Sequence, residues 1–209
     1  MRLEARIFAA RTLFAVSALT VSLAGCGTTS SLASNPQTSG TIDLKAYSRL
    51  LVTDFADEAS DKATPELKPV VKIKVEAAVK SFPDQIASTV TAAGAFNEVS
   101  RAAALSAPDA ATLVVRGAIT QWTDGSPTKR LLIGFGAGSA RFDARIQLLD
   151  GGSGDVLGTW IVDKNSWALG GAIAATQTPE TFMPGAARNI GDELSKRKRE
   201  GSIPPQRKK

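Results

Sequence analysis

The stretch ARFDARIQLLDGGSGDVLGTWIVDK, residues 140–164, decides the fold. In its first half, apolar residues at 140, 142, 144, 146 and 148 alternate with polar ones at 141, 143, 145 and 147. This alternation predicts a strand with one buried and one solvated face. Residues 150–155 (DGGSGD) predict a turn, because glycines accept positive φ angles. Residues 156–164 then return as the next strand, so the stretch predicts an antiparallel hairpin.

Three more strands are predicted on the N-terminal side of this hairpin. Residues 49–55 (RLLVTDF) form a mostly apolar run that is typical of a central strand. Residues 95–101 and 112–122 predict two further strands. Gly117 lies inside the last of these and indicates a bulge or a close backbone approach.

Helices are predicted between and after the strands. Residues 69–80 fit both a strand alternation and one helical face, and the helix propensity of EAAVK favours a helix. Ser81 and Pro83 predict the start of a further helix, which ends at Gly94.

The C-terminal part of the domain predicts one more helix and completes the element order. Residues 179–198 place Ala187, Ile190 and Leu194 on an inward face. The order β-α-β-β-β-β-α predicts an α+β fold. We expect a single mixed or antiparallel sheet of about five strands, with a β-meander, packed by two main helices.

The N-terminal residues carry the pattern of a bacterial lipoprotein signal. Arg2, Arg6 and Arg11 precede an uncharged, mostly apolar run over residues 12–22, which is too short for a stop-transfer helix. Residues 23–26 (LAGC) match a lipobox, which predicts cleavage before Cys26 and acylation of its thiol. The alternatives are an ordinary secretory peptide or an uncleaved anchor. Residue 27 is Gly rather than Asp, which favours the outer membrane of a diderm bacterium, facing the periplasm.

These patterns divide the chain into four parts. We expect a cleaved signal peptide over residues 1–25, and a lipidated cysteine with a flexible tether over 26–43, where the residues are small and polar. The α+β domain occupies residues 44–198, and residues 199–209 form a basic disordered tail. The membrane is thus an expected partner through the N-terminal lipid.

Charge is unevenly distributed along the chain. The formal net charge is +5, of which residues 1–25 contribute +2 and residues 196–209 contribute +6, so the remaining body is mildly acidic at −3. Lys196, Arg197, Lys198 and Arg199 are candidates for contact with anionic lipid head groups or other anionic envelope polymers. The alternative is a helix end with a favourable charge and no partner. Nucleic acid is not an expected partner outside the cytoplasm.

Composition excludes several kinds of catalytic site. The chain has no histidine, which rules out Ser-His-Asp and Cys-His catalysis. We predict no cofactor and no metal, and interpret Asp54, Asp57, Glu58 and Asp61 as a solvated acidic loop because calcium-loop spacing is missing. A carboxylate-based hydrolase stays an alternative, in which Asp54 would work with Asp143 or Asp155.

Two uncharged, glycine-containing segments flank the hairpin, at residues 131–140 and 166–177. They lack the Gly-Lys-Ser/Thr of a phosphate loop and the third glycine of a dinucleotide fingerprint. Either they pack on each other over one end of the sheet, or they form a self-association or membrane-contacting surface. The candidate surface residues are Leu131, Ile133, Gly134, Phe135, Gly136, Gly138, Trp167, Gly170 and Gly171.

Several positions together resemble an uncharacterised family of bacterial lipoproteins, the domain of unknown function DUF4410. The resemblance spans roughly residues 45–198, and its most specific part is the segment RLLIGFGAG at residues 130–138. Supporting positions are Val52, Asp54, Phe55, residues 94–96, Val99, residues 111–115, Gly117, Asp150, Gly154 and Leu157. The layout is also similar to a broader group that includes the curli secretion channel lipoprotein, lipoprotein activators of peptidoglycan synthases and the amino-terminal domain of the Tol translocation protein.

This resemblance implies an α+β domain used for assembly or for contact with partners, since none of these relatives is an enzyme. We therefore predict a non-catalytic outer-membrane lipoprotein with a periplasmic interaction domain, accessory to an envelope or secretion complex. It would bind a protein partner or self-associate. A small-ligand carrier, recognised by an apolar pocket under the sheet, is the first alternative.

Overall fold

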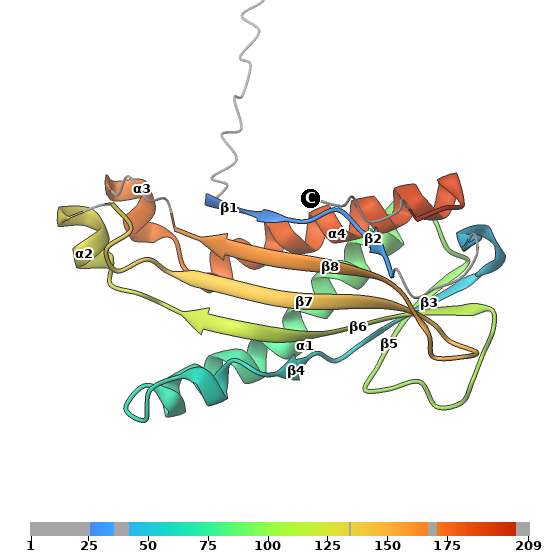
Figure 1. Cartoon of the computed structure of the whole chain (residues 1–209), viewed down its shortest axis with the longest axis horizontal. Helices are drawn as coiled ribbons and strands as arrows, with labels where there is room; N and C mark the ends of the chain where they lie inside the picture. The colour runs from blue at the N-terminus through green and yellow to red at the C-terminus, as the bar shows by residue number, and fades with distance from the viewer. Residues whose placement is uncertain (1–25, 36–41, 134, 167–170, 204–209) are drawn as a thin grey trace, which may run out of the picture.

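Strands β7 (Arg141–Asp150) and β8 (Val156–Asn165) form the predicted antiparallel hairpin in this computed structural model (Figure 1). They are neighbours in one mixed sheet with the order β1-β8-β7-β6-β3-β5. The structure describes residues 26–35, 42–133, 135–166 and 171–203. The predicted signal peptide over residues 1–25, and residues 204–209 of the predicted tail, lie outside the described residues.

The sheet is larger than predicted. Within the described ranges it has eight strands rather than about five. The added strands are short: β1 (Cys26–Thr29) and β2 (Ala33–Ser34) pair with β8, and β4 (Ala56–Asp57) pairs with β6. The predicted strands are present as β3 (Arg49–Thr53), β5 (Glu98–Ala102) and β6 (Thr112–Thr123). Since β3 runs parallel to β5 and β6 while the other long neighbours are antiparallel, the sheet is mixed.

Two long helices, α1 (Lys68–Ala93) and α4 (Pro179–Glu200), cover the same face of the sheet (Figure 1). The core between them contains the alternating apolar residues of β7 and the predicted inward residues of α4, Ala187, Ile190 and Leu194. Phe82 of α1 lies edge-on to Phe55 and Phe142, at ring-centroid distances of 5.6 and 5.2 Å. Such edge-to-face packing stabilises aromatic pairs beyond the area they bury.

Helix α1 is continuous, although the sequence predicts two helices that meet at Ser81. Pro83 lies inside α1 and is buried in the core together with Phe82 and Ile86. Packing of this face therefore outweighs the backbone hydrogen bond that an internal proline removes. Gly94 ends the helix in a left-handed conformation with φ 60°, as predicted.

Residues 26–35 are an edge of the sheet and not the predicted flexible tether. Leu32, the one large apolar residue among them, is buried in the core. Its backbone N–H donates to Oε2 of Glu193 at 2.9 Å, and Trp160 Nε1 donates to the same oxygen at 3.0 Å. Glu193 thereby fastens this segment to α4 and β8. Residues 36–41 of the predicted tether lie outside the described residues.

The two ends of the sheet are built from different segments. One end, the α2/α3 end, is formed where β6 ends, β7 begins, β8 ends and β1 begins, so that Thr123, Arg141, Asn165 and Cys26 lie in one row. The helices α2 (Pro127–Leu132) and α3 (Gly171–Thr176) extend beyond it (Figure 1). The opposite end carries the β7–β8 turn, and the 3-10 helix η1 (Leu44–Ala46) precedes β3 there. A second 3-10 helix, η2 (Ser60–Lys62), precedes α1.

Candidate interaction surface

The two uncharged segments flanking the hairpin meet at the α2/α3 end. Helix α2 begins after Ser126, whose hydroxyl oxygen accepts from the Lys129 N–H at 3.3 Å, and Pro127 occupies its first turn. Helix α3 belongs to the second segment and contacts α2. The described parts of the two segments therefore lie at the same end of the sheet, where α2 and α3 pack on each other.

Arg130 holds this end together. Its side chain is 2% exposed and donates five hydrogen bonds, all to backbone carbonyl oxygens. Two of the acceptors, Asp124 and Gly138, flank α2 at 2.8 and 2.7 Å. The others lie in α3 and just after it, in residues Ala174, Ala175 and Gln177, at 2.8 to 3.2 Å.

Burial lowers the pKa of the Arg130 guanidinium, while the Asp124 carboxylate opposes this shift. The planar guanidinium presents its five donors in a fixed geometry, which suits a set of converging carbonyl groups. Because one buried guanidinium binds carbonyl groups on both sides of α2 and in and just after α3, it fixes the position of α2 relative to α3.

Large apolar side chains project from this rigid base into solvent. Phe135 is 89% exposed and Leu132 76% exposed. We call the following five exposed residues the apolar end: Leu131, Leu132, Ile133, Phe135 and Ile173. Leu67 and Val70, also exposed, line a groove of about 390 Å³ beside Thr123 and Gly125 at the same end of the sheet. Seven of the nine large apolar side chains exposed in the described part of the chain therefore gather at one end.

The backbone at Phe135 is strained. It has a φ of 49°, and no other non-glycine residue in the described chain has a positive φ. Gly136 and Gly138 adopt φ 82° and 68°, which glycine accepts at no steric cost. A bulky residue in this region costs free energy, and such residues gather at functional sites.

Sequence reasoning found part of this surface. Leu131, Ile133 and Phe135 are exposed, while Gly136 and Gly138 shape the loop that returns to β7. Gly134, Trp167 and Gly170 lie outside the described residues, and Gly171 begins α3. Leu132, Ile173 and Arg130 were not predicted. Leu132 and Ile173 fall inside the two uncharged segments, whereas no local pattern marks Arg130 as buried.

The four candidate cations, Lys196 to Arg199, lie near the C-terminal end of α4, at the opposite end of the sheet (Figure 1). Arg197 pairs with Glu193 and Glu200, at 3.4 and 2.8 Å. Lys198 donates to the Lys45 carbonyl oxygen at 3.1 Å and lies over the Phe96 ring. Lys196 and Arg199 are exposed. The helix extends to Glu200, so the first residues of the predicted tail are helical.

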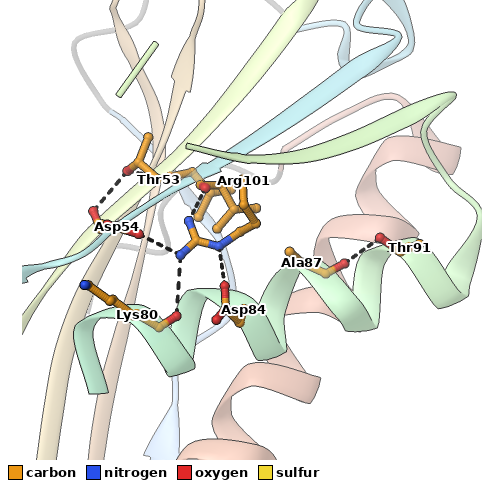
Figure 2. Close-up of polar contacts among 9 residues, drawn as sticks. Thr53, Asp54, Lys80, Asp84, Ala87, Thr91 and Arg101 are labelled. Atoms are coloured by element: carbon orange, nitrogen blue, oxygen red, sulfur yellow. Dashed lines mark hydrogen bonds and ion pairs between the residues drawn. The ribbon is translucent and has the colours of Figure 1, made fainter. Parts of the chain in front are cut away.

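The carboxylates of the hydrolase alternative do not come together. Arg101 of β5 donates to Asp54 at 2.8 Å and to Asp84 of α1 at 2.7 Å (Figure 2). Asp143 pairs with Arg141 on β7, and burial raises its pKa. Asp155 accepts from the Ser153 hydroxyl in the β7–β8 turn at 2.9 Å. Each carboxylate thus has its own partner on a different element.

The carboxylates of the acidic loop after β3 form hydrogen bonds and ion pairs within the domain. Asp57 accepts from the backbone N–H groups of Ala59 and Ser60, at 3.0 and 2.9 Å. Glu58 pairs with Arg145 at 2.9 Å, and Asp61 pairs with Lys68 at 3.0 Å. These side chains therefore organise the passage from β3 to α1.

A cavity of about 400 Å³ lies on the sheet face that α1 and α4 leave open. Val114 and Leu149 form its apolar floor with Leu105, and Arg116 and Asp54 also line it. The carrier alternative predicted an apolar pocket under the sheet. This cavity lies on the face of the sheet opposite α1 and α4.

The chain is similar to one protein family of unknown function and to solved structures of two bacterial proteins. A family model described as "Domain of unknown function (DUF4410)" matches residues 50–170. No curated protein matches the chain. A dodecamer of a single-substitution PelC variant from Paraburkholderia phytofirmans is similar in structure, with 16% identity, a TM-score of 0.49, and coverage of 81% of this chain and 98% of that one. A DUF330 protein from Xanthomonas campestris has 13% identity, a TM-score of 0.44, and coverage of 85% and 97%.

Helices that span a membrane need length and apolar composition together. None of the helices in the described residues meets both requirements.

Proposed function

The chain belongs to the DUF4410 family, and we propose that it is a non-catalytic, lipid-anchored envelope protein that acts by binding. The lipobox over residues 23–26 supports an anchor at Cys26 in the outer membrane, with the domain in the periplasm. In this proposal the domain is accessory to an envelope or secretion complex, and the apolar end is its contact surface.

One observation carries the proposal: a set of large apolar side chains is exposed on a base that Arg130 makes rigid. Soluble domains rarely expose contiguous apolar patches of this kind unless they bind something. Phe135 adds weight, because an exposed side chain on strained backbone contributes nothing to the core.

Site-specific photocrosslinking in intact cells tests the proposal. A photoreactive phenylalanine analogue replaces Phe135 in one variant and Ile161 in a matched control. Ile161 is apolar and 49% exposed, but it lies in the middle of β8. We expect crosslinked products from position 135, to protein or to lipid, and far fewer from position 161. Equal yields at both positions would contradict a dedicated contact surface.

The anchor is tested separately. Metabolic labelling with a fatty acid is expected to mark the wild-type chain, and the label is expected to be lost in Cys26→Ser. A wild-type chain that takes up no label would remove the lipid anchor from the proposal and leave the contact surface in place.

The cavity on the open sheet face supports a second candidate function, that of a small-ligand carrier. Its volume of about 400 Å³ falls in the range of small-molecule sites, and its lining combines apolar side chains with Arg116. Native mass spectrometry of the purified protein tests it. A carrier would retain a bound mass that Leu105→Trp displaces by filling the cavity. A protein that carries no extra mass after gentle isolation would exclude a tightly bound ligand.

A further inference from the structure

The predicted lipid-bearing residue lies at the same end of the sheet as the apolar end. Cys26 pairs with Asn165, the last residue of β8, and Asn165 also faces Arg141 across the sheet. Arg141 faces Thr123, the last residue of β6. From this row the chain continues after Thr123 toward α2 and after Asn165 toward α3 (Figure 1).

The connection from Cys26 to the domain is short because β1 begins at Cys26 itself. Ser30 N–H donates to the Ile161 carbonyl oxygen at 2.8 Å, and Ile161 N–H donates to the Ser30 hydroxyl oxygen at 2.8 Å. Leu32 follows, buried in the core and held by Glu193. A segment fixed in this way has none of the reach of a flexible linker. A lipid on Cys26 would therefore bring this end of the sheet directly to the membrane surface.

The chemistry of the apolar end suits that surface. Residues 131–140 contain no charged side chain, and the exposed Lys129 precedes them, separated only by the buried Arg130. Exposed Phe and Leu side chains with an adjacent cation are the composition of segments that enter the boundary between head groups and acyl chains. The bilayer also accounts for Leu67 and Val70, which are exposed at the same end.

We propose that the apolar end inserts into the interface of the bilayer that carries the Cys26 lipid. This inference rests on the proposed function, since it names the partner of the same surface. The bilayer, rather than a second copy or a protein partner, is the occupant that the position of Cys26 selects. The domain then has one fixed orientation, with the α2/α3 end down and the β7–β8 turn pointing away from the membrane.

Fluorescence of lipidated protein in phospholipid vesicles tests the inference. Cys26 is the only cysteine of the chain, so an added cysteine is the only free thiol once Cys26 is acylated. An environment-sensitive dye is attached in Leu132→Cys and Phe135→Cys, and in Ser106→Cys as a control. Ser106 is exposed in the loop that leads back to the start of β6.

In vesicles we expect the dyes at 132 and 135 to shift to shorter wavelength and to be quenched several-fold more by brominated lipid than the dye at 106. The shift should not depend on the protein-to-lipid ratio. Water-like emission at 132 and 135 in protein whose mass proves lipidation would overturn the inference and leave the proposed binding function standing. A shift that grows with protein density would overturn it in favour of a second copy. Purified protein without the lipid mass would overturn both the inference and the anchor.

Discussion

The Nε of Arg130 donates a hydrogen bond to the carbonyl oxygen of Ala174 at 2.8 Å, and this contact joins the two segments that flank the central hairpin. Ala174 is itself fully buried, so α3 is held by both its backbone and its side chain. The exposed residues on α2 and α3 are therefore held in one fixed arrangement. A flexible apolar loop would lose conformational entropy when it binds, whereas this surface is ordered before binding.

Replacing Arg130 should make this end of the molecule, or the whole domain, easier to unfold. Arg130→Met leaves five carbonyl oxygens without their donors, and Arg130→Lys restores only part of the set because an ammonium lacks the planar geometry. We expect each to lower the free energy of unfolding by about 2–4 kcal/mol, measured by urea denaturation. Lys129→Met, an exposed neighbour, should change it by less than about 0.5 kcal/mol. Equal stability of the two Arg130 variants and the wild type would contradict this role.

Phe135→Gly should weaken binding through the apolar end without lowering the stability of the fold. Glycine relieves the positive φ at this position, so we expect the free energy of unfolding to stay equal or rise by about 1 kcal/mol. Contact through the apolar end should weaken, because the most exposed side chain of the surface is removed. Thermal unfolding together with vesicle or partner binding checks both halves. A destabilised Phe135→Gly would show that the ring supports the fold.

Gly117 allows β6 to approach Phe55. A Cβ at this position would lie 2.8 Å from Cε2 of Phe55 and 2.9 Å from the Arg145 carbonyl oxygen, and the latter is backbone. Gly117→Ala should therefore lower the free energy of unfolding by about 1–3 kcal/mol in urea titrations. Gly185→Ala is the matched control, since nothing lies near its Cβ position in α4, and helix propensity predicts a gain of up to about 1 kcal/mol. A tolerated Gly117→Ala would mean that β6 shifts at little cost.

Stability should fall in acid partly through Asp109. Hydrogen bonds from the Thr112 hydroxyl, Arg49 and the Ala111 N–H hold the pKa of Asp109 at about 2, below its ordinary value. Because the folded pKa is the lower one, this contribution is complete above about pH 4 and is lost as the pH falls toward 2. Unfolding free energies measured from pH 5 to 2 should fall more steeply for the wild type than for Asp109→Asn. Identical slopes would contradict the assignment.

The central part of the fold follows from local pattern. The strict alternation over residues 140–148 predicted β7, and the glycine turn after it predicted the hairpin. The apolar spacing in residues 179–198 placed Ala187, Ile190 and Leu194 correctly in the core. Gly117 predicted either a bulge or a close backbone approach, and the structure shows the close approach, with the register shift of β6 lying between Ile119 and Gln121.

The errors arise where distant residues decide the outcome. Apart from Leu32, residues 26–35 are small or polar, and their contacts with β8 and Glu193 make them part of the sheet. Pro83 resembles a helix start locally, but core packing on both sides keeps α1 continuous. The acceptors of Arg130 come from three separate segments, so its burial has no signature near residue 130. The sequence also left open whether residues 131–135 are buried, because their position depends on the contacts of Arg130.

Helix α4 runs from the α2/α3 end to the opposite end of the sheet, so it sets the distance between the apolar end and the basic residues near Glu200. Its 22 residues span about 33 Å at 1.5 Å per residue, from the α2/α3 end to Lys196 and Arg199. With the apolar end on the bilayer, these cations stand several Debye lengths above the lipid head groups, because charges at physiological ionic strength are screened within about 8 Å. In that orientation their electric field would not reach the bilayer. The basic end of α4 would then be an electrostatic surface separate from the apolar end, on the side of the domain that points away from the lipid.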